Sequence, residues 1–193
     1  MLEFSRHYLS IELDLLVQQS VRAYQKQQYA KADVWLNEFS GVVQQLDSLL
    51  GAQPQSLSQW LQSAVAYGEN PEESRLYLHN AKMLLTVWGG TQLKDYASRG
   101  WQGMYAGFYL PRWQLFFQTL QQQPKISDVE LDRRLRDFEL QWTQSAELFP
   151  AAVPAAPLTQ LPTLLQRVDQ LNKAAGVALQ PKKALATHQG ARP

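Results

Sequence analysis

The 193-residue sequence contains no cysteine, and this absence removes several kinds of chemistry together. Without thiols the chain can form no disulfide, no thiolate nucleophile and no cysteine-ligated zinc site. Its three histidines, His7, His79 and His188, form no HxxxH pair. The chain also lacks a GxSxG motif, a phosphate-binding glycine loop and a dinucleotide-binding fingerprint. The sequence therefore predicts neither a metal site nor a cofactor.

A strong charge of one sign is also missing, since 18 basic residues face 17 acidic ones and the net charge is +1. Nucleic-acid binding requires a clustered basic surface, so we expect no nucleic-acid partner. The apolar runs, of which Met83–Trp88 is typical, are far shorter than the ~20 residues of a membrane-spanning helix. The first residues include Glu3 and Glu12, which is not the pattern of a signal peptide. The sequence predicts no membrane partner and leaves the localisation open.

What the chain does contain is enough apolar surface for a core, with 45% hydrophobic and 11% aromatic residues. Apolar residues recur at three- and four-residue steps, and neither β-alternation nor an internal repeat is evident. We therefore predict an all-α, helical-bundle-like domain of about six or seven helices over residues 1–150. An Ala/Pro linker then opens residues 151–193, for which we predict a short helix over 164–175 and a flexible tail.

Two long amphipathic helices are predicted at the start of the chain. The first spans about 3–28, and its apolar residues at helical spacing are Phe4, Tyr8, Ile11, Leu15 and Tyr24. The second spans about 30–50, ends at Gly51 and Pro54, and carries on one face Trp35, Phe39, Val42, Leu46 and Leu49.

Three further helices have recognisable starts. Ser56 can cap a short helix that ends at Gly68. Asn70 followed by Pro71 predicts a helix to about Trp88, whose inner side we expect to carry Leu76, Asn80, Met83, Leu84 and Val87. Ser127 and Glu130 have the spacing of a capping box and predict a helix to Pro150 that carries Leu131, Leu135, Phe138, Trp142 and Phe149.

The most unusual composition lies between Leu76 and Phe117. Gly89-Gly90 follows Trp88, and three glycines then recur at Gly100, Gly103 and Gly107. We predict a helix from about Leu93 to Phe108 with these glycines on one face, where packing against another backbone, a ligand or a partner would offset roughly 0.5–1 kcal/mol per glycine. A new helix is expected to begin at Pro111.

Trp88 is the residue of this stretch that most invites a functional hypothesis. A tryptophan that ends a helix at Gly-Gly can belong to the core or can project from a rim. Projected outward, its flat apolar face is suited to stacking on a pyranose ring. Asp95 has the same two interpretations, a helix cap or a ligand for a hydroxyl. The residues alone leave both alternatives open.

The order of motifs in this stretch resembles the C-terminal all-α domain of the α-N-acetylglucosaminidases, family 89 of the glycoside hydrolases. That pattern runs N-A-R, T-x-W-G, D-Y-A-x-R/K-x-W-x-G and F/Y-Y-x-P-R-W with F-F. The matching segments here are Asn80-Ala81-Lys82, Thr86–Gly89, Asp95–Gly103, and Phe108–Trp113 with Phe116-Phe117. Lys82 departs from the more common Arg, and Gly100 from Gln or Glu. The resemblance extends more weakly from about Arg6 to Pro150.

The resemblance implies a non-catalytic domain of a retaining exo-glycosidase. In the family, the two catalytic carboxylates come from a preceding (β/α)8 barrel, and this chain has no alternating βα pattern. The expected partners are that barrel and a glycan ending in α-linked N-acetylglucosamine. The helical domain would form one wall of the cleft, with Trp88, Tyr96 and Leu93 as substrate-binding residues and no catalytic residue of its own. Supporting roles are implied for Asn80, Asp95, Arg112 and Trp113.

Two other hypotheses remain beside this one. The chain could be a stand-alone helical interaction module descended from such a domain, which would cover its docking surface by self-association or with another partner. It could also act alone as a carbohydrate-binding module. Family members are secreted, periplasmic or lysosomal, and the chain itself does not indicate a compartment.

Overall fold

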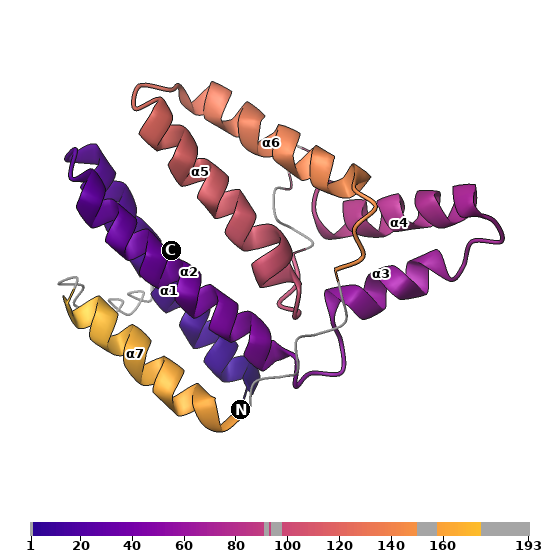
Figure 1. The fold of residues 1–193 in the computed structure, drawn as a ribbon, viewed down its shortest axis with the longest axis horizontal. Helices are drawn as coiled ribbons and strands as arrows, with labels where there is room; N and C mark the ends of the chain where they lie inside the picture. Colours follow the sequence, from indigo (N-terminus) through magenta and orange to yellow (C-terminus); the bar gives the residue numbers. More distant parts are fainter. Residues whose placement is uncertain (1, 91–92, 94–97, 150–157, 175–193) are drawn as a thin grey trace, which may run out of the picture.

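The computed structural model describes residues 2–90, 93, 98–149 and 158–174, and within these ranges it contains seven α-helices and no strand longer than an isolated bridge (Figure 1). A π-helical turn at Tyr105–Tyr109 leads into α5, and a 3-10 turn at Leu158–Gln160 leads into α7. The helices are α1 Leu2–Gln25, α2 Tyr29–Leu50, α3 Leu57–Val65, α4 Pro71–Leu85, α5 Leu110–Gln122, α6 Asp128–Gln144 and α7 Leu161–Ala174. The predicted all-α fold class is confirmed.

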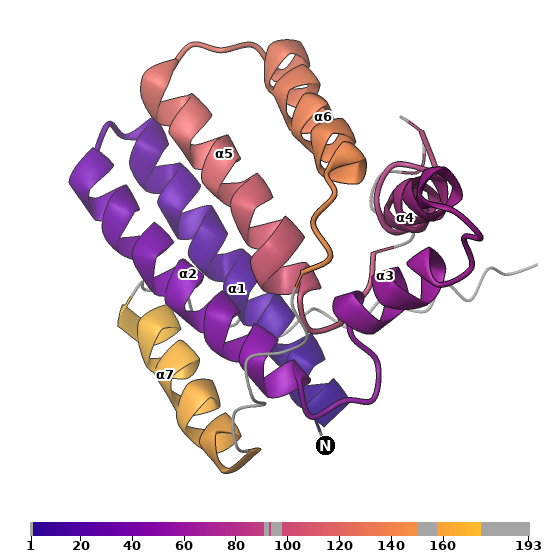
Figure 2. The ribbon, with the colours of Figure 1, turned by 45° about the vertical axis from the view of Figure 1, so that its right-hand side comes forward.

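The helices form two groups. The long antiparallel pair α1 and α2 is covered by α7 on one side and by α5 on the other, while α6 runs back along α5 and the shorter pair α3 and α4 lies at one end (Figures 1 and 2). Within α7, the Asn172 side-chain amide donates a hydrogen bond to the buried Glu12 carboxylate of α1. The division of the chain at residue 150 stays a prediction, because 150–157 and 175–193 lie outside the described residues.

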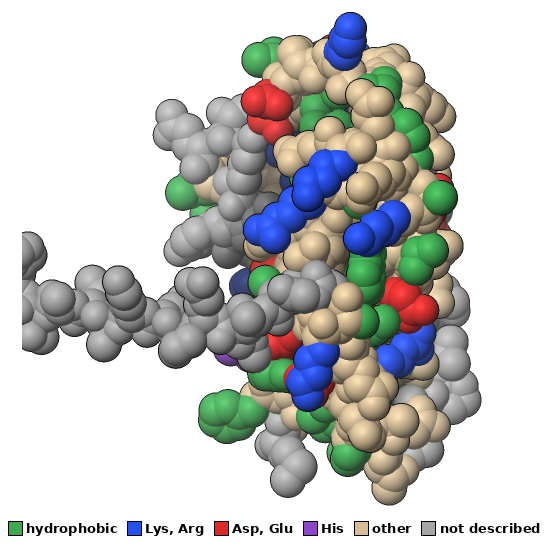
Figure 3. Space-filling model, turned by 90° about the vertical axis from the view of Figure 1, so that its left-hand side faces the viewer, with side chains coloured by type: hydrophobic (Ala, Val, Ile, Leu, Met, Phe, Trp, Pro, Cys, Tyr) green, Lys and Arg blue, Asp and Glu red, His purple; other side chains and the backbone are tan. Residues whose placement is uncertain are grey.

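Each group has its own core. The larger one, among α1, α2, α5 and α7, contains Leu9, Leu16, Phe39, Leu46, Phe117, Leu164 and Val168. The smaller one, among α3, α4, α6 and the π-helical turn, contains Leu57, Leu61, Leu78, Leu85, Met104, Phe108 and Trp142. On the face shown in Figure 3, basic, acidic and hydrophobic side chains are interspersed. None of the described helices meets the length and hydropathy that crossing a membrane requires.

The three predicted N-caps are present. The Ser56 hydroxyl accepts a hydrogen bond from the backbone N–H of Gln59 at 3.2 Å. The Asn70 side-chain oxygen accepts from two backbone N–H groups, of Glu72 and Glu73, at 3.1 and 3.0 Å. The Ser127 hydroxyl accepts from the Glu130 N–H at 3.3 Å. Caps of this kind contribute about 1 kcal/mol each to helix stability, because they satisfy N–H groups that have no partner inside the helix.

Of the apolar row that predicted α1, Tyr24 is buried in the core, but the other residues are not. Phe4 is 85% exposed, and Tyr8 and Ile11 are also exposed. Most of the buried face is a neighbouring row, which contains Leu9, Leu13, Leu16, Val17 and Ala23. Helix α1 carries apolar residues on more than one face. The spacing of these residues therefore indicates a helix but does not show which side packs against α2 and α7.

Helix α4 ends at Leu85 rather than at about Trp88, and its predicted inner side is wrong except for Val87, which is buried beyond the helix end. Leu76, Asn80 and Leu84 are exposed, whereas the buried residues are Leu78, Ala81, Lys82 and Leu85. Ala81 is small and Lys82 is charged, so a comparison of hydrophobicity alone predicts that the opposite face of α4 is buried. What turns Ala81 inward is its fit against α3, where the Trp60 indole donates to the Ala81 carbonyl at 3.1 Å.

The helix predicted from Leu93 to Phe108 is also wrong in its first part. Residues 98–103 are not helical, and Gly103 has a φ of +88°, so the glycines do not share one helix face. The reason is Asp47 of α2, whose carboxylate oxygen accepts from the N–H groups of Gly103 at 2.8 Å and Ala106 at 3.2 Å. Burial raises the pKa of Asp47, although its bonds to the backbone N–H groups act in the opposite direction. A cap supplied from another helix thus sets where this helix begins.

Pro111 does not start a separate helix, because α5 continues directly from the π-helical turn before it. A proline has no N–H to donate to the carbonyl four residues earlier, that of Gly107. The Trp142 indole donates to this carbonyl instead, at 3.0 Å. Gly107 also lies so close to the Phe149 ring that an added Cβ would be 2.7 Å from it, so close packing explains this one glycine.

The last predicted boundary is partly wrong. Helix α6 ends at Gln144, not at Pro150. Phe149 has a φ of +51° and stacks on Trp142 outside the helix, with ring centroids 5.6 Å apart.

Candidate functional site

The end of α4 is a tight turn built on one carbonyl oxygen. The backbone N–H groups of Thr86, Val87 and Trp88 all donate to the Met83 carbonyl, at 3.1, 3.0 and 3.1 Å. The chain then reverses through Gly90, which has a φ of +63° and donates its N–H to the Val87 carbonyl at 3.0 Å. Such a turn ends the helix while still satisfying the groups at its terminus.

This turn projects two of the predicted site residues outward. The Val87 side chain is buried, whereas Trp88 next to it is 46% exposed. Leu93 is also 46% exposed, and its N–H donates to the Gly89 carbonyl at 3.3 Å. An added Cβ on Gly89 would lie 2.6 Å from the Leu93 Cβ, so this approach requires glycine. The structure therefore brings Trp88 and Leu93 together at one exposed turn.

The third predicted residue, Tyr96, lies outside the described residues, as does Asp95. Substrate binding by Trp88, Leu93 and Tyr96 remains a prediction. Of the expected supports, Asn80 is exposed on α4, and Trp113 packs against the larger core beside Phe39.

Sequence reasoning missed an exposed apolar row on α4 that leads to Trp88. Tyr77 and Leu84 are both exposed and seven residues apart, so they lie along one side of the helix. The exposed Trp88 follows on the turn after the helix end. Tyr67, from the segment before α4, extends the row by packing against Tyr77 with ring centroids 6.4 Å apart. The seven-residue spacing of Tyr77 and Leu84 could have indicated this row from the sequence. The prediction that Leu84 lies on the inner side of the helix concealed it.

Behind this row, Lys82 joins α4 to the end of α6. Its ammonium group is fully buried and donates to the Ser145 carbonyl at 2.8 Å and the Ser145 hydroxyl at 2.7 Å. It also lies 5.0 Å from the centre of the Trp142 ring, within the range of a cation–π interaction. Burial lowers the pKa of Lys82 to about 8, with a small opposing effect of Glu147.

A second connection reaches the turn from α5 and α6. The Arg112 guanidinium donates to the Glu139 carboxylate at 2.7 Å, and Arg136 lies 3.5 Å from the same carboxylate. Arg136 also donates to the Val87 carbonyl at 3.4 Å. The predicted support residue Arg112 is thus linked to the turn through two residues of α6 that no motif indicates.

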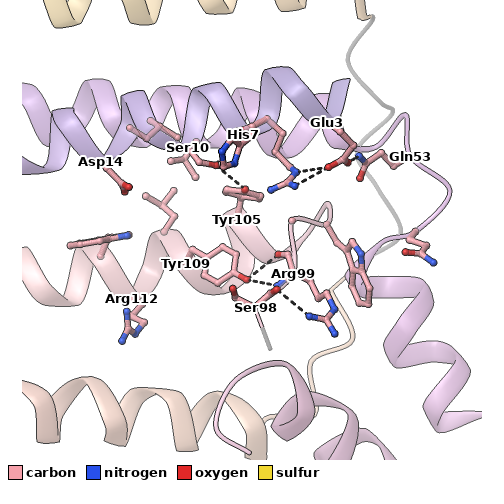
Figure 4. A pocket seen from close by; sticks show the side chains of 18 of the residues that line it. Glu3, His7, Ser10, Asp14, Gln53, Ser98, Arg99, Tyr105, Tyr109 and Arg112 are labelled. Atoms are coloured by element: carbon pink, nitrogen blue, oxygen red, sulfur yellow. Dashed lines mark hydrogen bonds and ion pairs between the residues drawn. The ribbon is translucent and has the colours of Figure 1, made fainter. Parts of the chain in front are cut away.

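A cavity of about 820 Å³ with polar and apolar lining lies between α1 and the beginning of α5 (Figure 4), and the predicted supports Arg112 and Trp113 line it. The Tyr105 and Ser10 hydroxyls are 3.4 Å apart in it, and the Tyr109 hydroxyl donates to the Arg99 carbonyl at 2.9 Å. Neither Trp88 nor Leu93 lines this cavity. Beside it, Gly100 leaves space for Arg6, because an added Cβ would lie 2.7 Å from the guanidinium.

The part of the chain that the structure describes holds no group of three or more His, Asp or Glu side chains suited to a metal ion. Among the described residues, we take the turn at the end of α4, where Trp88 and Leu93 are exposed, as the candidate site.

Comparison with solved structures identifies the class of protein in which this fold occurs, the family 89 glycoside hydrolases. A Clostridium perfringens enzyme of this family, solved in complex with its substrate GlcNAc-alpha-1,4-galactose, aligns with 92% of this chain and 21% of its own, with a TM-score of 0.71 and 19% identity. Its complex with PUGNAc aligns with 86% of this chain and 20% of its own, with a TM-score of 0.71 and 20% identity.

The chain belongs to the α-N-acetylglucosaminidase (NAGLU) C-terminal domain family, whose model matches residues 1–167. Human alpha-N-acetylglucosaminidase is 29% identical over 112 residues, which are 55% of this chain and 15% of the human protein. The chain thus spans between about a seventh and a fifth of the length of these relatives.

Proposed function

We propose that this chain is the helical domain of an α-N-acetylglucosaminidase, which packs on a (β/α)8 catalytic barrel and walls the cleft that holds a terminal α-linked N-acetylglucosamine. Family membership supports the proposal, as does the much greater length of the relatives, which leaves room for a separate catalytic domain. The Clostridium perfringens complexes, one with GlcNAc-alpha-1,4-galactose and one with PUGNAc, suggest the class of ligand.

The observation that carries the proposal is the exposed indole of Trp88 on a hydrogen-bonded turn. A sugar-stacking residue must present its ring face to the cleft and must keep that orientation when no sugar is bound. The three bonds to the Met83 carbonyl hold the backbone of Trp88, and its 46% exposure leaves ring surface available. Leu93 adds apolar surface at the same turn. Stacking of this kind supplies orientation and apolar burial, not acid or base catalysis.

The surface for the barrel would be the apolar row on α4. Leu84 and Tyr77 on α4, with Tyr67 packed against Tyr77, continue from Trp88, and each is exposed in the chain alone. Exposed apolar residues that lie in a row on a helix are typical of an interaction surface, whereas single exposed ones are common on any protein. A barrel docked on this row would place Trp88 at the edge of the contact, where a cleft between the two domains would open.

In this arrangement the chemistry belongs to the barrel. Retaining hydrolysis needs two carboxylates about 5–5.5 Å apart, one as nucleophile and one as acid and base. We therefore expect no turnover of an aryl α-N-acetylglucosaminide by the isolated chain. Turnover that is abolished by replacing an Asp or Glu of this chain would contradict the proposal.

The decisive test is a chimera in which this chain replaces the helical domain of the Clostridium perfringens enzyme. We expect activity, and we expect Trp88→Ala to lower kcat/KM by about tenfold, since aromatic contacts are worth about 0.5–1.5 kcal/mol beyond area burial. Phe4→Ala, at an exposed aromatic residue of α1, is the matched control and should have no effect. A folded chimera without turnover would contradict barrel docking, and equal effects of the two substitutions would contradict the cleft role.

The exposed row of α1 favours a second candidate function, a stand-alone interaction module. Phe4, Tyr8 and Ile11 form an apolar surface that does not include Trp88. If this surface mediates self-association, light scattering should give a dimer or larger species that Ile11→Glu converts to a monomer. A monomeric chain with no change on substitution would rule this candidate out.

A further inference from the structure

We propose that Arg136 is a positioning residue for Trp88, held in place by Glu139 and, through it, by Arg112. This inference rests on the proposed function, because it concerns how the sugar-stacking ring is oriented. The three residues come from α5 and α6, whereas Trp88 follows α4, so the arrangement is a contact between separate helices.

The first step is the contact between Arg112 and Glu139. The Arg112 Nε atom lies 2.7 Å from Glu139 Oε1, and the Glu139 side chain is only 12% exposed. A charge-assisted bond that is so short and so sheltered from water is stronger and better directed than a surface ion pair. It fixes the Glu139 carboxylate relative to α5.

The second step is from Glu139 to Arg136. Arg136 Nη1 lies 3.5 Å from Glu139 Oε2, so the two arginines use different oxygens of one carboxylate. Arg136 Nη2 donates to a different group, the Val87 carbonyl, at 3.4 Å. A guanidinium group can do both because its donors form a rigid planar fork, which a lysine ammonium cannot reproduce.

The third step is the peptide unit between Val87 and Trp88. The Val87 carbonyl and the Trp88 N–H belong to this one planar unit. Its N–H end donates to the Met83 carbonyl, and its carbonyl end accepts from Gly90 and from Arg136. With both ends of the plane held, the Trp88 Cα, which lies in this plane, is fixed at the position from which its side chain projects. Among the described residues, Arg136 is a partner of this unit that comes from outside the turn.

The alternative is that Arg136 merely holds α6 to α4. In that case its loss would lower the stability of the chain without a specific effect on Trp88. The two roles are distinguished by a signal from Trp88 itself, measured beside global stability and beside the other five tryptophans.

The experiment is nuclear magnetic resonance on the ¹⁵N-labelled chain, with the Trp88 indole assigned through Trp88→Phe. We expect Arg136→Lys and Glu139→Gln each to shift the Trp88 indole and amide signals and to speed exchange of the Trp88 amide by roughly three- to tenfold. Helix content should be kept and the indole signals of Trp35 and Trp60 should stay in place. Arg133→Lys, at an exposed arginine of α6 that pairs with Glu130 and Asp137, is the matched control and should change none of these signals.

An unchanged Trp88 signal in the folded Arg136→Lys and Glu139→Gln variants would overturn the proposal, as would an equal change in Arg133→Lys. The measurement needs neither a barrel nor a sugar, so its failure is distinguishable from failure of the proposed function. In the chimera, Arg136→Lys should raise KM more than it lowers kcat, since a misdirected ring weakens sugar binding.

Discussion

The indole N–H of Trp142 donates to the carbonyl of Gly107 at 3.0 Å, and this bond replaces the one that Pro111 cannot make. A residue of α6 thereby allows a proline to lie within a continuous helical segment. The same indole ring lies beside the Lys82 ammonium group, so Trp142 of α6 contacts both α4 and the π-helical turn before α5. Trp142 is therefore one of the residues through which the elements of the smaller core contact one another.

Trp142→Phe keeps an aromatic ring but removes the N–H, which leaves the Gly107 carbonyl without its donor. We expect a loss of about 1–3 kcal/mol in the free energy of unfolding, measured with urea. In a Pro111→Ala background the backbone at this position gains an N–H that can donate to the Gly107 carbonyl, so Trp142→Phe should have a smaller effect there. Equal losses in both backgrounds would show that ring packing, not the hydrogen bond, explains the destabilisation.

Lys82 makes the stability of the chain depend on pH in the alkaline range. Its pKa is lowered to about 8 by burial, from an unfolded value of 10.5. Between these two values the unfolded chain binds the proton and the folded chain does not, so stability rises with pH there, by up to about 1.4 kcal/mol per pH unit. Below about pH 8 the folded chain carries the full penalty of a buried charge.

The comparison that isolates this effect is Lys82→Met, which removes the titrating group. Urea unfolding of both proteins from pH 7 to pH 10 should show the native chain gaining stability relative to the variant, by on the order of 1–3 kcal/mol. Other lysines and the tyrosines titrate in both proteins, so their contributions cancel in the difference. Parallel curves would mean that Lys82 titrates normally despite its burial.

Gly103 and Gly100 should respond differently to alanine. At Gly103 the φ of +88° is strained for any residue with a Cβ, and the added atom would lie 3.0 Å from the Leu57 Cβ. We expect Gly103→Ala to destabilise the chain by about 1–2 kcal/mol. At Gly100 the obstructing group is the end of the flexible Arg6 side chain, which can move, so Gly100→Ala should have less than half that effect. Thermal unfolding of the two variants tests the order, and a larger effect at Gly100 would contradict it.

The sequence predicts the capped helix starts and the buried face of α2 correctly, but not the buried faces of α1 and α4. The reason is the range of the interactions involved. The caps at Ser56, Asn70 and Ser127 depend on neighbours within three residues. The side of α4 that is buried depends on Trp60 reaching Ala81 and on Lys82 reaching Ser145, which local hydrophobicity does not reveal. Likewise, the start of the π-helical turn before α5 is set by Asp47, which lies 56 residues before Gly103 in the sequence.

In the candidate site, too, the sequence indicates some residues, whereas others are revealed only by the folded structure. The motif resemblance identified Trp88 and Leu93, and both are exposed at one turn. It also indicated Arg112 but not Glu139 or Arg136, because contacts between α5, α6 and the end of α4 are formed only by tertiary packing.

Adjacent residues of α4 provide the sharpest test of its orientation and of its proposed role. Leu84 is 51% exposed on the apolar row, whereas Leu85 is 4% exposed in the smaller core. Leu84→Glu should therefore change the free energy of unfolding of the isolated chain by less than about 0.5 kcal/mol, as surface substitutions do. Leu85→Glu buries an unpaired charge and should destabilise it by more than about 3 kcal/mol.

The same pair separates folding from docking. Because Leu84→Glu leaves the fold intact yet places a charge on the proposed contact with the barrel, the chimera that carries it should lose activity or separate into its two domains on limited proteolysis. Leu76→Glu is a control, since Leu76 is exposed on α4 but lies to one side of the row that Tyr77, Leu84 and Trp88 form. If Leu84→Glu and Leu76→Glu leave activity equally intact, the row on α4 is not where the catalytic barrel binds.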